Sequence, residues 1–534
     1  MSLPRTALPL ALLLLVPALA SPTEARTWND ERARCVDPFP CGDLWPAGLV
    51  GPFDYTLHDL DVASDDGARL RGTLVLPTLP DGVRAPAILI ATPYWGNAHA
   101  RPGEAGVAAW PEPWELLARN GFAVAAVNVR GSGLSDGCVG MWGERERLDQ
   151  RVLVDWLATQ PWSNGRVGAT GISYGGTTAY EAAIAAGPAL KAIVAASPVA
   201  DPFTLHYSPQ GLSNPGLNSY RAAYPVAFGQ DVCEDVLRNA LDAALGPVAS
   251  RDAAYWEERH LLKRLPNATA AIFVTHAFRD GHHFQPTDVW DAVRSPKRMM
   301  LGHWDHTYPT TSTWDATLVA WFDYWLKGVG SPGKLDRVEY LVAGSGWETS
   351  RSWPPRGAES RDIAVEGRFR SAPAAALFDP YSTKARACVQ EGPDGIPLGV
   401  LAVGPVLARK TKLAGNPYAD LWVTSTEDGG AITVRLVDLG PTWACAGGAE
   451  SDARLLAFGQ ADLRFHATRY DPTPFPIGEA QRVRVDLTPV GETVPAGHRL
   501  AIVLDHGHVG VGLTPYWTPV LDVHAGSRLV VPVV

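Results

Sequence analysis

The sequence predicts an α/β protein in which helices cover both faces of a mostly parallel sheet, followed by a second domain made of β-strands. Short apolar strands alternate with amphipathic helices in the first part of the chain, and strong helical patterns are missing from the last part. A helical stretch without convincing buried strands interrupts the alternation. The 534 residues are 46% hydrophobic and 19% charged, which is typical of folded globular proteins, and this length predicts more than one domain.

Residues 1–20 have the pattern of a cleavable signal peptide. Arg5 supplies the positive end, Ala7 to Val16 form a short apolar run, and Ala18-Leu19-Ala20 gives the small-x-small pattern of a cleavage site. The apolar run is too short for a stable membrane anchor, and no cysteine directly follows the cleavage point. We therefore expect cleavage after Ala20 and a secreted or periplasmic protein that is not a lipoprotein.

The charge balance argues against one class of partner. A formal net charge of −10 does not provide the basic face that a nucleic-acid partner requires. No other segment approaches the length of a membrane span, so we expect no membrane span in the mature chain. The sequence leaves the oligomeric state open.

The strands and helices of the α/β domain follow one another in a regular order. An alternating hairpin is predicted from Tyr55 to Pro77, and buried strands at Ala85–Tyr94, Phe122–Val129, Arg166–Thr170 and Leu190–Ala196. Amphipathic helices are predicted between these strands at Trp114–Asn120, Glu144–Gln160 and Gly175–Ala186. After the interruption come strands at Ala270–Thr275 and Arg298–Leu301 and a helix at Thr313–Lys327.

The interruption, residues 201–266, is predicted to be a helical cap inserted into the α/β domain. Its helical patterns are Val232–Leu245 and Tyr255–Leu265. The α/β domain then consists of residues 21–200 and 267–332, and a Gly- and Pro-rich turn marks its end.

Residues 333–534 form the predicted all-β domain. Turns rich in Gly and Pro separate short β-like runs, among them Leu421–Ser425, Ala431–Leu436, Arg482–Leu487 and His498–Leu504. This spacing is typical of an antiparallel β-sandwich or jelly roll.

All six cysteines lie beyond the signal peptide, and an even number in an exported protein favours disulfides. Cys35 and Cys41 are close enough to close a small loop, and Cys388 with Cys445 could tie the C-terminal region. That arrangement leaves Cys138 to pair with Cys233. None of the spacings fits a zinc site.

The central chemical signal is Gly171-Ile172-Ser173-Tyr174-Gly175, a G-x-S-x-G pattern. A predicted strand precedes it and a helical pattern starts just after Tyr174. A serine in such a strand-to-helix turn sits on a strained elbow with its hydroxyl above the sheet. This context predicts a nucleophilic Ser173 on an α/β-hydrolase core with an inserted helical cap and a C-terminal all-β jelly-roll domain.

A serine nucleophile needs a base, and the base needs a carboxylate that orients it. The fold requires the chain order Ser, acid, His, with acid and base in loops after late strands. Asp280 follows the strand ending at Thr275, and His303 and His306 both follow the strand ending at Leu301. Position alone does not choose between the two histidines.

A metal site is the weaker alternative for this region. His276, His282 and His283 lie close together in the sequence, but adjacent histidines rarely ligate one ion together and no carboxylate spacing supports them. We expect no metal and no organic cofactor.

Several segments resemble the cocaine-esterase and X-Pro dipeptidyl-peptidase family of serine hydrolases. They are Arg130-Gly131-Ser132-Gly133, Gln160-Pro161-Trp162 and Gly165–Gly176, with Leu413-Ala414-Gly415 and Gly497-His498-Arg499-Leu500 in the β-domain. In that family a Trp-x-His closes the triad, and Trp304-Asp305-His306 matches it, so the resemblance implies His306 as the base. It also implies an oxyanion hole made by the Tyr94 hydroxyl, in Thr92-Pro93-Tyr94, and the backbone N–H of Tyr174.

The chain departs from one pattern of this family. Members that hydrolyse α-amino-acid esters carry acidic residues just after the triad acid, where this chain has Gly281-His282-His283. Asp231, Glu257 or Glu258 in the cap could substitute.

The main prediction is hydrolysis of small acyl esters or amides through an acyl-enzyme on Ser173. The alternative is a dipeptidyl-peptidase cutting short peptides after proline, and the remote alternative is a non-catalytic surface- or carbohydrate-binding protein.

Overall fold

The computed structural model describes residues 45–95, 112–203, 231–245, 253–280, 286–372, 387–446, 449–450, 453–468, 471–506 and 517–534. The predicted signal peptide, Cys35, Cys41, His282 and His283 lie outside the described residues.

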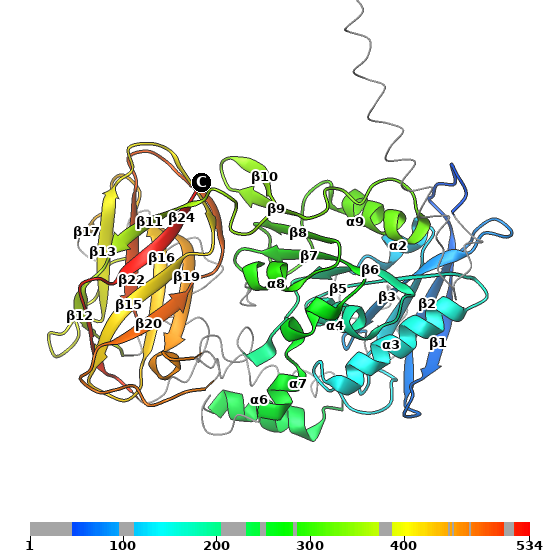
Figure 1. Cartoon of the computed structure of the whole chain (residues 1–534), viewed down its shortest axis with the longest axis horizontal. Helices are drawn as coiled ribbons and strands as arrows, with labels where there is room; N and C mark the ends of the chain where they lie inside the picture. Colours follow the sequence, from blue (N-terminus) through cyan, green and yellow to red (C-terminus); the bar gives the residue numbers. More distant parts are fainter. Residues whose placement is uncertain are drawn as a thin grey trace, which may run out of the picture.

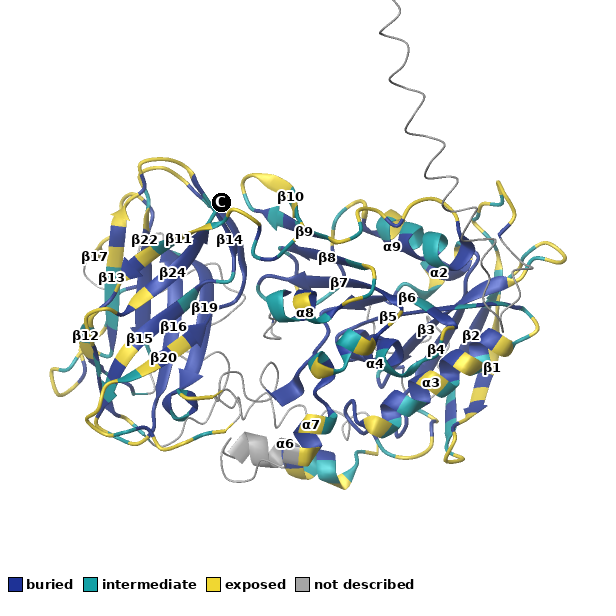
Figure 2. Ribbon diagram, viewed as in Figure 1, coloured by how far each residue is buried: buried dark blue, intermediate teal, exposed yellow. Residues whose placement is uncertain are grey.

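A ten-stranded mixed sheet forms the centre of the first domain (Figure 1). Its strand order is β1-β2-β4-β3-β5-β6-β7-β8-β9-β10, and the pairs from β4 through β9 are parallel. The strands are β1 (Tyr55–Ala63), β2 (Arg69–Pro77), β3 (Ala85–Thr92), β4 (Ala123–Asn128), β5 (Ser163–Ile172), β6 (Leu190–Ala196), β7 (Ala271–Ala277), β8 (Lys297–Gly302), β9 (Arg337–Val342) and β10 (Gly346–Ser350). Every residue of β3, β4 and β7 is buried, which explains why these strands are apolar runs without alternation (Figure 2).

Helices cover both faces of this sheet, as predicted for an α/β fold. On one face α3 (Glu144–Thr159) and α4 (Tyr174–Ala185) pack into one apolar core, joined by α8 (Pro286–Ala292). On the other face α2 (Trp114–Arg119) and α9 (Trp314–Phe322) pack into a second core. The predicted helix ending at Lys327 instead changes after Phe322 into a π-helical turn, Asp323–Lys327.

The predicted cap contributes α6 (Glu234–Leu245) and α7 (Ala253–Glu258), which lie beside α3 in Figure 1. A disulfide joins Cys233, just before α6, to Cys138 in the loop that precedes α3. The second predicted cap helix is shorter than expected. It ends at Glu258, and two 3₁₀ turns follow, Leu261–Lys263 and Leu265–Asn267; the second has Pro266 in its first turn, where the missing N–H of proline does not matter.

The second domain is built from two antiparallel sheets around its own apolar core, at the left of Figure 1. The eight-stranded sheet contains β11 (Glu359–Ala364), β12 (Gly367–Arg370), β14 (Thr411–Gly415), β15 (Tyr418–Ser425), β20 (Gln481–Asp486), β21 (Val490–Val494), β23 (Val520–Val523) and β24 (Arg528–Val533). The four-stranded sheet contains β13 (Gly399–Val406), β16 (Ala431–Asp438), β19 (Arg454–Asp462) and β22 (Arg499–Asp505). The predicted Cys388–Cys445 disulfide is present, as is Cys138–Cys233.

The first sheet extends beyond the predicted boundary at residue 332. β9 pairs in parallel with β8, and β10 pairs with β9, so the sheet continues to Ser350. β9 alternates buried and half-buried residues, which locally looks the same as a sandwich strand. β9 belongs to the first sheet because it pairs with β8, and the local sequence pattern does not reveal this long-range pairing.

Within the described residues, no helix is both long enough and apolar enough to cross a membrane.

Candidate active site

Ser173 lies in a strained turn between β5 and α4. Its φ of +58° is a left-handed conformation that residues with a side chain rarely adopt. The Ser173 N–H donates to the Ala196 carbonyl at 2.9 Å, and the Thr177 N–H donates to the Ser173 carbonyl at 3.0 Å. The turn is therefore fixed to β6 on one side and to the first turn of α4 on the other.

Two glycines in the G-x-S-x-G-G segment are required by space. A Cβ on Gly171 would lie 2.5 Å from the carbonyl carbon of Gly175. A Cβ on Gly176 would lie 2.4 Å from the carbonyl oxygen of Ala196, on the neighbouring strand. Only glycine allows the strand and the helix to approach this closely at the elbow.

Asp280 and His306 meet at the carboxyl ends of two neighbouring strands. Because β7 and β8 are parallel and paired up to Ala277 and Gly302, the loops that follow them start side by side. His306 Nδ1 lies 2.8 Å from Asp280 Oδ1 and 2.9 Å from Asp280 Oδ2, so the ring N–H donates to the carboxylate. Asp280 is buried, with 3% exposure, whereas the His306 ring is partly exposed. The Asp280 carboxylate thus fixes the orientation of the ring through Nδ1. Nε2 is the ring nitrogen that does not bond Asp280.

His276 also lies beside Asp280, with Nε2 3.9 Å from Asp280 Oδ2. Its Nδ1 is 2.9 Å from the Ala277 carbonyl. Burial lowers the pKa of His276, which favours a neutral ring at this position. His276 therefore lies beside Asp280 as a buried neighbour whose neutral form is favoured.

Tyr94 and Tyr174, the two residues expected at the oxyanion hole, are in contact with each other. Their ring centroids are 6.1 Å apart with the planes nearly perpendicular, and the Trp142 ring also packs on Tyr174, with the centroids 4.9 Å apart. The Tyr174 hydroxyl donates to Glu146, whose carboxyl also accepts from the N–H groups of Gly140 and Trp142. The first residue of α4 is therefore held by its side chain as well as by its backbone.

Glu112 is a buried carboxyl group that sequence analysis missed. Its Oε1 accepts from the Ile172 N–H at 3.2 Å, and its Oε2 accepts from the Tyr308 hydroxyl at 2.9 Å. The β3–β5 ladder ends at Ala169, so Glu112 replaces a strand as the acceptor for Ile172. Burial raises the pKa of Glu112 to about 7, and the two hydrogen bonds oppose that rise.

His303, the other histidine after β8, points to the second domain. Its Nε2–H donates to the carbonyl of Gly491 at 2.8 Å, and its ring packs on Phe278. The structure therefore gives the two candidate histidines different partners: His306 contacts Asp280, and His303 contacts β21.

The acidic cap residues considered for binding a substrate ammonium group differ in their surroundings. Glu257 is exposed and forms an ion pair with Lys263 at 2.5 Å. Glu258 accepts from the Glu144 N–H and lies 3.6 Å from Arg259. Asp231 is exposed, and its backbone pairs with Gly131 and Val139. Partners within the chain thus already occupy Glu257 and Glu258.

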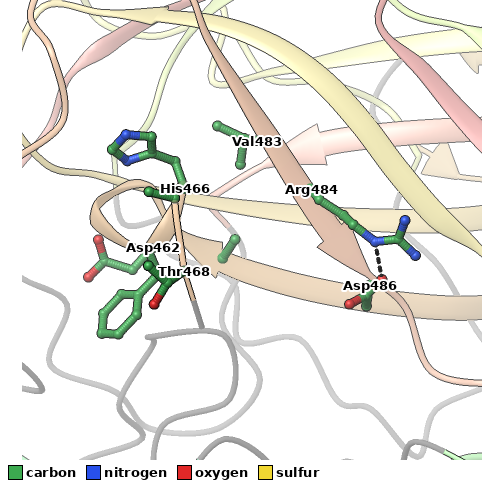
Figure 3. Close-up of a pocket in the computed structure, with 9 residues that line it drawn as sticks. Asp462, His466, Thr468, Val483, Arg484 and Asp486 are labelled. Atoms are coloured by element: carbon green, nitrogen blue, oxygen red, sulfur yellow. Dashed lines mark hydrogen bonds and ion pairs between the residues drawn. The ribbon is translucent and has the colours of Figure 1, made fainter. Parts of the chain in front are cut away.

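A pocket elsewhere in the molecule lies in the β-domain, between the end of β19 and β20 (Figure 3). Asp462, His466 and Arg484 are among the residues that line it. Its charged groups have partners: Arg464 bonds Asp462, and Arg484 bonds Asp486 at 2.7 Å, the dashed line in Figure 3. Its lining residues include none of Ser173, Asp280 and His306.

Two family models match consecutive parts of the chain. Residues 66–308 match the family model described as X-Pro dipeptidyl-peptidase (S15 family). Residues 332–529 match the model described as X-Pro dipeptidyl-peptidase C-terminal non-catalytic domain. Together the two models cover most of the chain, and the first contains Ser173, Asp280 and His306.

Individual proteins show the same likeness at low sequence identity. The chain is 24% identical to the cocaine esterase of Rhodococcus sp. (strain MB1 Bresler), over 82% of this chain and 88% of the esterase. It is 23% identical to the Xaa-Pro dipeptidyl-peptidase of Lacticaseibacillus rhamnosus, over 73% of this chain and 59% of that protein. The crystal structure of an aminopeptidase from a marine sediment Thaumarchaeota archaeon has the same fold, with a TM-score of 0.70 and 16% identity, covering 94% of this chain and 99% of that chain.

Proposed function

The chain belongs to the X-Pro dipeptidyl-peptidase (S15) family and is a serine hydrolase, and from this premise we propose that Ser173, Asp280 and His306 form its catalytic triad. The observation that carries the proposal is the hydrogen bond between His306 Nδ1 and the buried Asp280 carboxylate. Two supporting observations are the strained turn at Ser173 and the shared sheet edge from which all three residues project.

In the proposed mechanism His306 removes the proton of the Ser173 hydroxyl as the oxygen attacks the substrate carbonyl carbon. The imidazolium that forms is stabilised by Asp280, which stays ionised and keeps the ring in the productive tautomer. His306 then gives this proton to the leaving alcohol or amine, and an acyl group remains on Ser173. A water molecule, deprotonated by His306, attacks the ester and releases the acid.

The proposed oxyanion hole consists of the Tyr94 hydroxyl and the Tyr174 backbone N–H. Tyr174 is the first residue of α4, and the first N–H groups of a helix have no acceptor within the helix. The helix dipole adds positive potential at the same place. Loss of one donor in such a site commonly costs about 10²–10³ in rate.

The proposed substrates are esters or amides of small acyl groups, and the second candidate is peptide cleavage after an X-Pro pair. Relatives named for both activities support both substrate classes. The partners of Glu257 and Glu258 disfavour these two residues as the group that would hold a substrate ammonium, which leaves Asp231 as the described cap candidate for the peptidase.

The proposed location is outside the cytoplasm, by cleavage of the signal peptide after Ala20. Disulfides persist in oxidising compartments, so Cys138–Cys233 and Cys388–Cys445 support export. We also retain the division into an α/β-hydrolase domain, a cap at residues 201–266 and a C-terminal β-domain, with the end of the first sheet moved to Ser350.

The test compares hydrolysis of p-nitrophenyl butyrate and Ala-Pro-p-nitroanilide by the purified mature chain, with Ser173→Ala as the blank. Ester turnover that disappears in the Ser173→Ala variant, with little anilide cleavage, supports the esterase. If cleavage of the anilide dominates instead, the protein is a dipeptidyl-peptidase rather than an esterase. Turnover that survives in the Ser173→Ala variant, or no labelling of Ser173 by a fluorophosphonate, contradicts the proposed triad.

A further inference from the structure

The β-domain touches both loops that carry the proposed acid and base. Arg279, the residue before Asp280, donates to the Leu455 carbonyl at 2.7 Å and to Glu492 Oε1 at 3.3 Å. His303, three residues before His306, donates to the Gly491 carbonyl at 2.8 Å. Leu455 lies on β19 and Gly491 and Glu492 on β21, so all three acceptors belong to the β-domain.

Glu492 is the charged centre of this contact. Its side chain is 4% exposed and lies among three basic groups: Arg279 at 3.3 Å, Arg454 at 2.7 Å and His303 at 3.9 Å. Asp438 is the further carboxylate of the network, 3.5 Å from Arg454. Burial and the neighbouring Arg454 lower the pKa of Arg279, whereas Glu492 raises it, so Glu492 favours the charged guanidinium here.

The backbone at this contact leaves little freedom. The Gly491 carbonyl accepts from the Ala343 N–H at 3.0 Å as well as from His303, which ties β21 to the end of β9. A Cβ on Gly491 would lie 2.5 Å from the Leu341 carbonyl oxygen and 2.5 Å from the Phe278 ring. Since Phe278 precedes Arg279, β21 packs directly against the start of the Asp280 loop.

We propose that Glu492, together with the Gly491 carbonyl, positions the Asp280 and His306 loops relative to each other. The two loops contact the same two consecutive residues of β21, so a change at β21 moves both ends of the Asp280–His306 hydrogen bond. Glu492 is a positioning residue: it acts through Arg279 and His303 and does not contact the reacting atoms. The inference rests on the proposed triad and assigns a role to His303 and to the β-domain.

The predicted effect of Glu492→Gln is a loss of rate rather than of ester binding. The neutral amide removes the negative charge beside Arg279, whereas Arg454 keeps Asp438 at 3.5 Å, so we expect the Asp280 loop to shift. Small displacements of catalytic groups cost up to about 10²-fold, so we expect kcat for p-nitrophenyl butyrate to fall about 10- to 100-fold with KM within about twofold. We also expect the pH profile of kcat/KM to move, because that profile reports the acid and base groups that act in the free enzyme and their relative position changes.

Two further variants keep the test independent of folding. His303→Ala removes only the imidazole that contacts Gly491 and leaves Glu492 in place; we expect the same kind of kcat loss, non-additive with Glu492→Gln in the double variant. Asp420→Asn is the control, because Asp420 on β15 is a β-domain carboxylate whose basic partners are Arg482 on β20, at 2.6 Å, and Arg528 on β24, at 4.0 Å, rather than residues of the triad loops. The control is expected to keep kcat and the pH profile.

Kinetics are normalised to the folded fraction, measured by circular dichroism and by titration of Ser173 with a fluorophosphonate. Unchanged kcat per folded molecule in both Glu492→Gln and His303→Ala overturns the proposal. So does an Asp420→Asn variant with an equal kcat loss, since that outcome reports general destabilisation of the β-domain. If the wild-type chain itself neither labels nor turns over ester, the triad has failed, and the β21 contact is then judged on the Asp280–His306 geometry in a crystal structure of Glu492→Gln.

Discussion

At the scale of single residues, the neighbourhood of Ser173 is built on buried carboxyl groups with distinct partners. Asp280 bonds His306, Glu112 bonds Ile172 and Tyr308, and Glu146 bonds Tyr174. A buried carboxyl group is costly unless its oxygens accept hydrogen bonds. Each of these groups therefore fixes the residue that it contacts, and each gives a separate expectation.

The two histidines after β8 are expected to differ in the severity of their alanine variants. His306→Ala removes the proposed base and should lower kcat for p-nitrophenyl butyrate by at least about 10⁴-fold. His303→Ala removes a ring that contacts Gly491, Glu492 and Phe278 but not Asp280, and it should lower kcat far less. Steady-state kinetics of both variants, checked for equal circular dichroism, measures the difference. A dead His303 variant beside an active His306 variant would reverse the assignment.

Glu112 predicts a specific pH dependence of stability. Its pKa is raised from 4.5 to about 7 in the folded chain, so the folded state holds this proton more tightly than the unfolded state. The stability from this group is fully present below about pH 4.5 and is lost as the pH rises through about 7. Relative to wild type, Glu112→Gln should therefore gain stability between pH 5 and pH 8, by up to roughly 3 kcal/mol.

The measurement is the urea midpoint of both proteins at pH 5 and pH 8. Glu115→Gln is the matched control, because Glu115 is an exposed carboxylate in the same segment, paired with Arg119 on the surface. The control should follow the wild-type pH dependence. Parallel pH profiles for the wild type and Glu112→Gln would contradict the assignment of this titration to Glu112.

At the scale of elements, local patterns predicted most of the fold and long-range contacts decided the remainder. β3, β4, β7, α3 and α4 were predictable because their apolar runs or helical periods are properties of short segments. The attachment of β9 and β10 to the first sheet was not predictable from the sequence. β9 alternates buried and half-buried residues and β10 has no buried residue, and both patterns fit either domain.

The site divides in the same way. The Ser173 elbow and the order of Asp280 and the histidines are visible in the sequence. Position in the sequence could not decide which of His303 and His306 contacts Asp280. That depends on which side of one short loop faces β21. Glu112 and Glu492 carried no signal, because a glutamate becomes a buried anchor only through partners distant in the chain.

The Cys138–Cys233 disulfide links the cap to the loop that holds Tyr174 in place. It closes a loop with a sequence separation of 95, and removing a native disulfide typically costs about 2–5 kcal/mol. Gly140 and Trp142 follow Cys138 and donate to Glu146, which bonds Tyr174. We expect the Cys138→Ser/Cys233→Ser double variant to lose both thermal stability and kcat/KM.

The Cys388→Ser/Cys445→Ser double variant is the comparison, since that disulfide lies in the β-domain with a sequence separation of 57. It should lose stability and keep kcat/KM when assayed well below its Tm. Equal kinetic losses in the two double variants would remove the special role of the cap linkage. Thermal unfolding and ester hydrolysis at 25 °C measure both quantities.

At the scale of the whole molecule, Trp353 joins the two domains. It is 2% exposed and stacks on Phe278 at 5.9 Å, and its indole N–H donates to Asn416 at 2.7 Å. Asn416 in turn donates to Thr287, and Thr287 donates to the Trp353 carbonyl. This closed set of contacts connects the start of the Asp280 loop and α8 to the start of β15.

Trp353→Ala should loosen the contact between the domains. Truncation of a buried tryptophan costs about 3–5 kcal/mol, and we expect calorimetry to resolve separate unfolding transitions for the two domains in place of a coupled one. Trp422→Ala, in a residue of the β-domain that is 44% exposed, should leave the calorimetric profile nearly unchanged. A Trp353→Ala profile that keeps the wild-type shape would show that the domains unfold together for another reason.

The contact between His303 and Gly491 joins residues 188 positions apart, so it cannot form until the ribosome has made most of the chain. A ribosome makes Ser173, Asp280 and His306 long before it makes β21, so a nascent chain carries the whole proposed triad without the strand that is proposed to position it. A polypeptide cut short before residue 491 should consequently be a poor hydrolase even if its first sheet has formed. If β21 has the proposed role, full activity would appear only after synthesis of the chain is nearly complete.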